Sequence, residues 1–346
     1  MFNSRRWSIL SLGVCLLYIG CNGSSGNLPV ALPSDSPSPP GVLGRGTVAV
    51  VDRTSTATRI LVLPPHGDKF QEIPIAGQNV AANSLAFDRL GHLYVGIDNP
   101  TGNDKYEVLE IDIHRRKLLR EITDLPSWSH SSVATDDENV LYVNTKALAG
   151  GDIKLYRPGD TKPWREIKDP HSPFSMLVAR GSLWVGYQGF FADALARYRL
   201  RSTDRTWFAH VANYLPLALA ANPEGSLVAA RSRRGSTISV QVADVNSKKR
   251  KQIFEGSAQA IASDDSGNLY IAEHRGKIHP CSFHDCSQYF DTDATNLALA
   301  VSPLDGLLYV ACLGKASIQV YNPRTRNQVK YIPIPGGTPT QLAIEP

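Results

Sequence analysis

The chain has 346 residues, with 36 Lys plus Arg, 32 Asp plus Glu and a formal net charge of +4 at pH 7. Without Arg5 and Arg6, which precede the first apolar segment, the formal charge falls from +4 to +2. So small an excess of positive charge argues against a dedicated nucleic-acid-binding protein.

The first residues predict export. Arg5 and Arg6 are followed by an apolar stretch over residues 7–20, which is too short to span a membrane as a helix. Tyr-Ile-Gly-Cys at 18–21 resembles the lipobox of bacterial lipoproteins, although Tyr18 stands where leucine is usual. The resemblance implies a signal peptide over 1–21 and a lipid on Cys21, at the periplasmic or extracellular face of a bacterial cell envelope. Simple cleavage of the signal and a retained anchor are the alternatives.

Residues 22–45 are rich in Ser, Pro and Gly, with SDSPSPPG at their centre. This composition offers little apolar surface to bury, so we expect a tether between the lipid and the folded part. The tether would reach on the order of 70 Å if extended as polyproline, and about 25 to 30 Å as a relaxed coil.

An apolar triplet, LYV or a close variant, recurs through the rest of the chain. Its first residues are Leu93, Leu141, Leu183, Leu227, Leu269 and Leu308. The spacings range from 39 to 48 residues and average about 43. Such a period in strand-rich sequence is typical of a β-propeller, in which each repeat is a four-stranded blade packed against its neighbours. We therefore predict a single all-β propeller domain over residues 46–346.

The blade count follows from the alternating third strands, such as YEVLEID from Tyr106 and IKLYR from Ile153. Counting TVAVVD from Thr47 as a further third strand gives seven blades. TQLAIEP at the chain end is predicted to supply an inner strand of the first blade. Strands from both termini would then close the ring and remove an exposed sheet edge. One strand of this closing blade is not evident, so six blades is the alternative.

Two segments resemble known repeats. The closing segment from Leu308 resembles the YVTN-type repeat of surface and periplasmic propellers, and SDDSGNLYIAEHRGKI over 263–278 resembles NHL-type repeats. These families include scaffolds, lyases and lactonases, so the resemblance implies architecture and leaves the activity open. No run of residues matches the catalytic pattern of the virginiamycin-lyase or lactonase propellers, so none of their catalytic residues is carried over.

A ligand site is expected at the channel mouth, where second-to-third-strand loops and inter-blade loops converge. The candidate residues are Asp98, Trp128, His130, His171, Tyr187, Arg231, Glu273 and His274. Glu273 and His274 would form an acid–base pair with Arg231 as an anion clamp, although neighbouring strand residues point to opposite faces. No cofactor is predicted, and a divalent metal at the mouth stays open. Ordinary packing or solvation of these residues is the alternative.

The cysteines near the end of the chain have two interpretations. Cys281 and Cys286 flank a four-residue turn, so in an exported chain they could face each other at disulfide distance. With His279 and His284 they would instead offer four zinc-type ligands, in a spacing that is cramped for tetrahedral closure. Cys312 follows a buried strand and is expected to be a core residue.

The turns predicted between third and fourth strands are basic. They would share one face of the disc, making it positive and suited to anionic lipid or an envelope polymer, unless it is only a solvated rim. The main candidates are Arg115, Arg116, Lys248, Lys249, Arg250 and Lys251, and Arg53 is assigned to the same set.

One function is favoured by three features. These are the predicted tether, a channel mouth whose candidate residues include acidic, basic and aromatic side chains, and the lack of a set of catalytic residues that converge on one point. We expect a lipid-anchored, monomeric propeller that binds a protein or envelope polymer as a non-catalytic scaffold. The alternative is a lyase or lactonase that acts on a small molecule at the mouth. The sequence leaves catalysis undecided but favours its absence.

Overall fold

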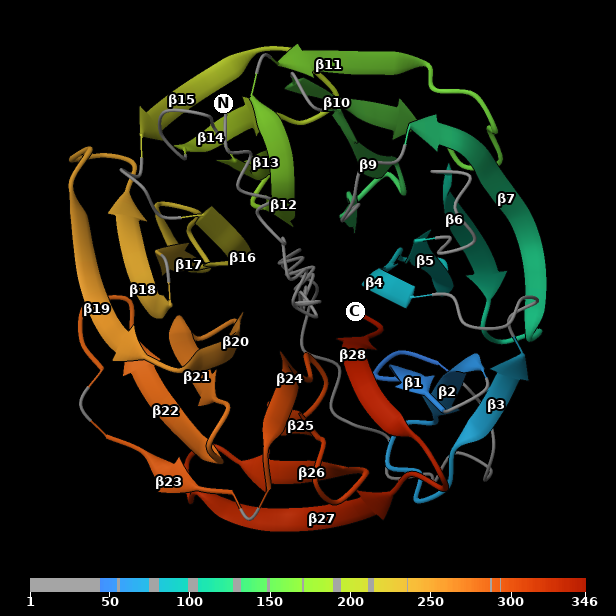
Figure 1. Cartoon of the computed structure of the whole chain (residues 1–346), viewed down its shortest axis with the longest axis vertical. Helices are drawn as coiled ribbons and strands as arrows, with labels where there is room; N and C mark the ends of the chain where they lie inside the picture. Colours follow the sequence, from blue (N-terminus) through green and yellow to red (C-terminus); the bar gives the residue numbers. More distant parts are fainter. Residues whose placement is uncertain are drawn as a thin grey trace, which may run out of the picture.

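The computed structural model describes residues 44–54, 57–74, 81–98, 105–126, 132–147, 150–169, 171–188, 194–210, 215–234, 236–286, 288–292 and 294–346. The strands β1 to β28 form seven four-stranded sheets, whose strands pair in antiparallel fashion. The sheets stand around a common centre as the blades of a propeller (Figure 1). The prediction of seven blades is therefore confirmed, and the alternative of six is wrong.

Each blade has its first strand near the centre and its last at the rim (Figure 1). From the centre outward, the first blade contains β28 (Thr338–Ile344), β1 (Val48–Arg53), β2 (Thr58–Leu63) and β3 (Gln71–Pro74). The second contains β4 (Ala81–Phe87), β5 (His92–Asp98), β6 (Lys105–Asp112) and β7 (Lys117–Pro126). The third contains β8 (Val133–Thr135), β9 (Leu141–Ala147), β10 (Gly150–Tyr156) and β11 (Arg165–Asp169).

The remaining four blades follow in chain order. The fourth contains β12 (Ser172–Ala179), β13 (Ser182–Gln188), β14 (Ala194–Arg199) and β15 (Arg205–His210). The fifth contains β16 (Leu215–Ala221), β17 (Leu227–Arg234), β18 (Thr237–Asp244) and β19 (Arg250–Gly256). The sixth contains β20 (Ala258–Ser263), β21 (Asn268–Glu273), β22 (Lys277–Ser282) and β23 (Phe290–Asp291). The seventh contains β24 (Asn296–Val301), β25 (Leu308–Cys312), β26 (Ser317–Asn322) and β27 (Asn327–Pro333).

Both ends of the folded region close the ring, as predicted. β28 pairs with β1 from Val48 opposite Ile344 to Arg53 opposite Thr338, so the ring closes within residues 48–344. One prediction is wrong: TVAVVD forms the second strand of its blade, because it pairs with β28 on one side and β2 on the other. The strand that was not evident is β2, TRILVL. β1 and β2 are both buried along nearly their whole length, so neither shows the alternation that marks a third strand.

The apolar core lies in the seams between consecutive blades. One seam packs Ala49 and Val51 of the first blade against Leu85, Leu93 and Val95 of the second. Leu93 and Val95 belong to an LYV triplet and are 0% exposed. Burying a Val or Leu side chain contributes about 1.5–3 kcal/mol. The recurring triplet is therefore the part of each repeat that joins one blade to the next.

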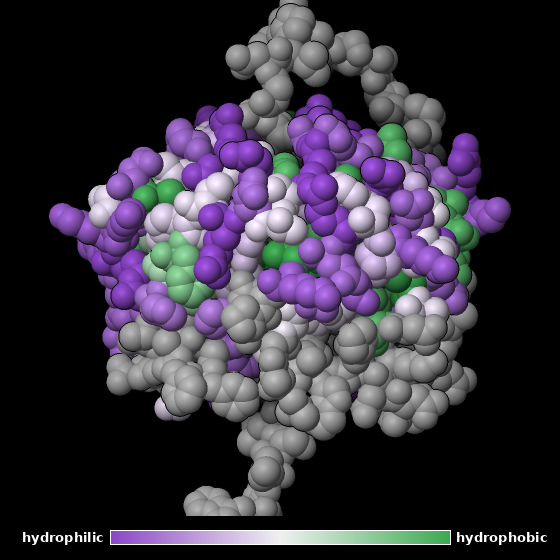
Figure 2. All heavy atoms as spheres, turned by 90° about the horizontal axis from the view of Figure 1, so that it is seen from above, coloured by the Kyte–Doolittle hydropathy of each residue, from purple (hydrophilic) through white to green (hydrophobic). Residues whose placement is uncertain are grey.

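The surface of the disc is mainly hydrophilic. Figure 2 views it from the edge, and the apolar patches among the described residues there are small and separate. The described large apolar side chains that remain exposed are Leu90, Leu118, Leu119, Tyr289, Leu304, Leu313, Val329 and Tyr331. No helix among the described residues is long and apolar enough to cross a membrane.

Candidate functional site

The disc has two faces that are defined by the blade connections. The mouth face carries the turns between second and third strands and the links between blades. The opposite face carries the turns from first to second and from third to fourth strands. We call it the chain-end face, because Gly46 and Glu345 meet there: the Gly46 N–H donates to the Glu345 carbonyl oxygen at 3.0 Å.

Part of the predicted mouth site lies outside the described residues. Trp128 and His130 belong to ranges that the structure does not describe, as does Cys21, the predicted lipidation site. The backbone of Asp98 ends β5, but its side chain is likewise outside the described part. The described part of the predicted mouth site therefore consists of His171, Tyr187 and the candidate residues of the fifth and sixth blades.

Glu273 lies at the end of β21, in the seam between the fifth and sixth blades. Its Oε2 accepts a hydrogen bond from the Ser257 hydroxyl at 2.9 Å. Its Oε1 lies 2.5 Å from Nε2 of His279 on β22. The side chains of Glu273 and His279 are only 17% and 12% exposed. The ring of Phe254 from β19 packs edge-on against the ring of His279, with 4.9 Å between the ring centroids, and this contact fixes the imidazole between the blades.

The imidazole that pairs with Glu273 is thus His279, and His274 points elsewhere. His274 is exposed, and its backbone N–H donates to the Ser257 carbonyl oxygen at 3.0 Å. Side chains alternate along a strand, so Glu273 and its neighbour diverge. His279 shares the face of Glu273 because Lys277, two residues before it, is the register partner of Glu273.

Arg231 on β17 lies in the same seam as Glu273 but is fully buried, with 1% of its surface exposed. Its Nε donates to the carbonyl oxygen of Ala258, the first residue of β20, at 2.8 Å. A charged hydrogen bond to a buried carbonyl is worth about 1.5–3 kcal/mol. Arg231 therefore links the second strand of the fifth blade to the first strand of the sixth.

His171 and Tyr187 meet in the fourth blade. Their ring centroids are 5.7 Å apart, and His171 also lies 5.5 Å from the ring of Phe208. Tyr187 is fully buried, and its hydroxyl lies 2.8 Å from that of Tyr198. These aromatic contacts are typical of packing within a blade.

Cys281 and Cys286 form a disulfide, as the first interpretation predicts, with their Cα atoms 4.4 Å apart. The alternative zinc arrangement with His279 and His284 is wrong, because sulfurs joined to each other cannot act as thiolate ligands. Within the described ranges, no three His, Cys, Asp or Glu side chains lie together in a way that would hold a metal ion. Cys312 is buried and unbonded to another cysteine, as expected.

Replacing both Cys281 and Cys286 by Ser should lower the free energy of unfolding by about 2 kcal/mol, because the short loop is no longer closed in the unfolded chain. The disulfide also holds the hairpin whose His284 carbonyl oxygen accepts from Lys251 Nζ of the fifth blade at 2.7 Å. Urea unfolding measures the change. Adding reductant to the unmodified protein should reproduce the value of the double variant, and an unchanged midpoint in both cases would contradict the prediction.

The basic turns lie on the chain-end face, with one correction. Arg53 ends β1, between the second and third strands, and so belongs to the mouth face. The third-to-fourth turn of the first blade instead carries Lys69, which is exposed. The other predicted residues, Arg115, Arg116 and the run from Lys248 to Lys251, are exposed at or next to third-to-fourth turns.

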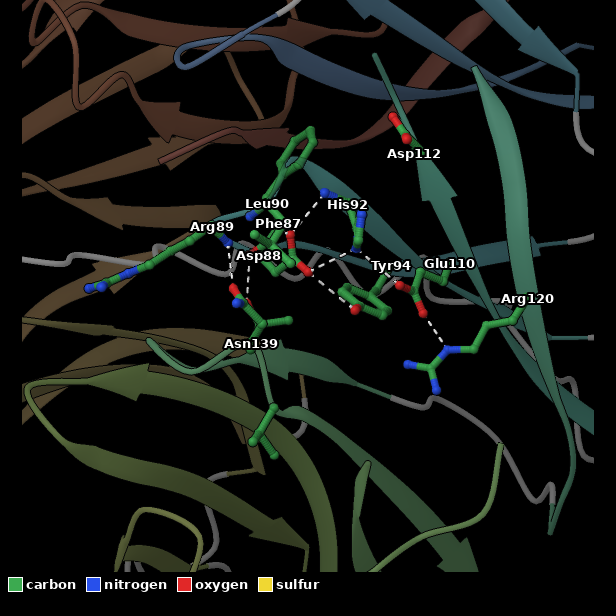
Figure 3. A network of polar contacts seen from close by, with 12 residues as sticks. Phe87, Asp88, Arg89, Leu90, His92, Tyr94, Glu110, Asp112, Arg120 and Asn139 are labelled. Atoms are coloured by element: carbon green, nitrogen blue, oxygen red, sulfur yellow. Dashed lines mark hydrogen bonds and ion pairs between the residues drawn. The ribbon is translucent and has the colours of Figure 1, made fainter. Parts of the chain in front are cut away.

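A network on the chain-end face was not predicted from the sequence (Figure 3). Oδ1 of Asp88 accepts from the backbone N–H groups of Leu90 and His92, each at 2.9 Å, and Oδ2 lies 3.3 Å from the Tyr94 hydroxyl. Nδ1 of His92 lies 3.0 Å from Glu110, which also binds Arg120. Burial raises the pKa of Asp88, partly offset by His92, and burial likewise raises the pKa of Tyr94.

The same pairing of an aspartate with the tyrosine of an LYV triplet recurs in two other blades. Asp136 binds the Tyr142 hydroxyl at 3.0 Å, and Asp264 binds that of Tyr270 at 2.9 Å. In each case the aspartate precedes the tyrosine by six residues, which is the signal that could have revealed the motif. The motif satisfies a buried hydroxyl and caps the turn between first and second strands, so it is structural.

A pocket of about 430 Å³ also opens on the chain-end face, where the sixth and seventh blades meet. Asp264, Asp265 and Asp305 line it, together with Arg324 and Pro346. This pocket could not be predicted from the sequence, because its residues come from three separate turns and the end of the chain.

The geometry defines a seven-bladed β-propeller, and comparisons with solved structures agree. Neither a protein-family model nor a curated protein sequence matches the chain. Many solved structures share its fold. One is hydrazine synthase from Kuenenia stuttgartiensis, with 15% identity over 80% of this chain and 90% of that one and a TM-score of 0.61. A protein from Lactobacillus plantarum has 12% identity over 86% and 99%, with a TM-score of 0.65.

A third similar structure is apo AztD from Citrobacter koseri, with 11% identity over 86% of this chain and 98% of that one and a TM-score of 0.56. At identities this low, the structural similarity establishes the shared architecture and nothing about the ligand or reaction.

Proposed function

We propose that the protein is an exported, lipid-anchored β-propeller that binds a protein or envelope polymer through its mouth face and performs no catalysis there. The observation that supports this proposal is the state of Glu273, the candidate base. Both of its carboxylate oxygens are engaged inside the seam, by Ser257 and by His279. The seam therefore uses this carboxylate for packing the blades.

A general base must reach the proton of a bound substrate, directly or through one water. Glu273 would have to give up one of its two partners to do so. Arg231 is the candidate anion clamp, but its Nε donates a hydrogen bond to the Ala258 carbonyl oxygen, and only 1% of its surface is exposed. These contacts favour the binding scaffold over the lyase or lactonase.

The anchoring part of the proposal depends on residues 1–45. The lipobox-like segment would place a lipid on Cys21, and residues 22–45 would form the tether. The described chain begins at Gly44, on the chain-end face, because Gly46 and Thr47 bond with Glu345 there. The tether would therefore reach the disc from the side opposite the mouth, which leaves the mouth face open to a partner.

The proposal is tested by melting the chain from residue 22 onward in the presence of sugars, lactones and divalent metals, with and without chelator. A ligand at a hundredfold over its Kd stabilises by about 2.7 kcal/mol, which is a measurable rise in midpoint. We expect no turnover of any compound, and we expect any rise with a sugar to be the same in Glu273→Gln. Turnover that is lost in Glu273→Gln but kept in Ser257→Ala, which removes the hydrogen bond from Ser257 and leaves the carboxylate, would establish the catalytic alternative.

A further inference from the structure

The chain-end face presents consecutive positive charges on a well-defined turn. Lys248, Lys249 and Arg250 join β18 to β19 and are all exposed. Asp244 holds this turn together, since its Oδ1 accepts from the N–H groups of Asn246 and Ser247. Within the described part of the chain, none of the three cations forms an ion pair. Their charge is therefore presented to the outside.

A second basic turn lies on the same face in the second blade. Arg115, Arg116 and Lys117 follow β6 and are exposed. Arg115 pairs with Asp112 at 3.2 Å and is still 80% exposed. The second and fifth blades are well separated around the ring (Figure 1), so positive charge occurs on both sides of this face.

Two exposed leucines lie at turn tips of the same face. Leu90 is 54% exposed in the second blade, and Leu304 is 49% exposed in the seventh. These blades flank the first blade, where the described chain begins. Leu304 also lies beside Gly46, since a Cβ on that glycine would be 3.1 Å from Leu304 Cδ2. The acidic residues Asp265 and Asp305 also lie on this face, where the sixth and seventh blades meet. Exposed leucines on a face that carries clustered cations are typical of surfaces that rest in a lipid headgroup region.

We propose that the chain-end face docks on an anionic lipid surface, with Lys248, Lys249, Arg250 and the turn at Arg115 to Lys117 against the headgroups and Leu90 and Leu304 at the interface. This inference deepens the proposed function and rests on its orientation, because the tether would leave from this same face. A docked disc would hold its mouth face away from the membrane. The fixed orientation replaces free movement of the disc at the end of its tether.

The test is sedimentation with vesicles of phosphatidylcholine alone or with about one third phosphatidylglycerol. The protein is the chain from residue 22 onward, which contains the closed ring and lacks the lipid, so the result does not depend on modification of Cys21. We expect binding only to the phosphatidylglycerol vesicles, and we expect it to weaken strongly as ionic strength rises from about 0.05 M to about 0.5 M. Each Lys or Arg at an anionic surface strengthens binding roughly fivefold.

The variant Lys248→Ser, Lys249→Ser, Arg250→Ser should weaken vesicle binding by at least about tenfold. The matched control is Arg53→Ser, Arg275→Ser, Lys315→Ser, which removes the same charge from exposed residues of the mouth face and should change binding less than about twofold. Both variants should keep the melting midpoint. Equal losses in the two variants, or binding that ignores phosphatidylglycerol, would overturn the proposal. Binding to a soluble anionic polymer without binding to vesicles would overturn it too.

Discussion

Replacing Arg201 by Met should lower the free energy of unfolding by about 3 kcal/mol, because it leaves a buried carboxylate without its cation. Arg201 follows β14 in the fourth blade and reaches the turn between β8 and β9 of the third. Its Nε donates to Asp136 at 2.8 Å and its terminal nitrogens bind Asp137 and Glu138. The side chain of Asp136 is 0% exposed, so the carboxylate cannot be solvated once Arg201 is removed.

A further hydrogen bond joins Arg201 to the third blade. Its backbone N–H donates to the Tyr142 hydroxyl at 3.0 Å, and that hydroxyl also bonds to Asp136. Burial and the neighbouring carboxylate raise the pKa of Tyr142. The Met variant keeps the backbone bond and loses only the guanidinium, so its effect reports on the charged link.

Urea or thermal unfolding measures the effect of Arg201→Met. The control is Arg199→Met in the same turn, which removes an ion pair to Asp204 whose side chains are 70% and 60% exposed. Such an exposed pair contributes about 1 kcal/mol or less. If the two variants were equally stable, the link between the third and fourth blades would contribute no more to the free energy of unfolding than a surface ion pair does.

Ending the chain after Gly337 should abolish cooperative unfolding. This truncation removes β28, the innermost strand of the first blade and the pairing partner of β1. Leu342 belongs to the apolar cluster shared with the seventh blade and Ala343 to the cluster shared with the second. Both seams of the first blade would therefore lose buried apolar side chains, and β1 would become an exposed sheet edge.

A transferred strand provides the control for this truncation. Residues 338–346 placed directly before Gly44 would join β28 to β1 by a hairpin, since Gly46 and Thr47 already bond to Glu345 at 3.0 and 2.9 Å. We expect this rearranged chain to recover a sharp thermal transition and native near-UV circular dichroism. A truncated chain that melts like the intact one, or a transferred strand that restores nothing, would show that ring closure does not hold the fold.

The architecture could be predicted from the sequence because its determinants are local. The LYV triplets recur at a regular period, each marks a buried second strand, and TQLAIEP contains the short apolar run Leu-Ala-Ile of a buried strand that needs a partner. The disulfide was also predictable, since Cys281 and Cys286 sit on either side of one short turn. Within the architecture, the position of TVAVVD in its blade was predicted wrongly, as third strand instead of second. The reason is that β1 and β2 are both buried on two faces, so neither shows alternation.

The contacts of the candidate site required the tertiary structure. Glu273 binds His279 and Ser257, and Arg231 binds the Ala258 carbonyl oxygen, in a seam between two blades. Arg201 similarly reaches a carboxylate 65 residues earlier in the chain. The period of two residues along a strand determines which face of a blade a side chain occupies. Which partner it meets across the seam depends on how two different sheets pack against each other, and nothing in the local sequence encodes that distance.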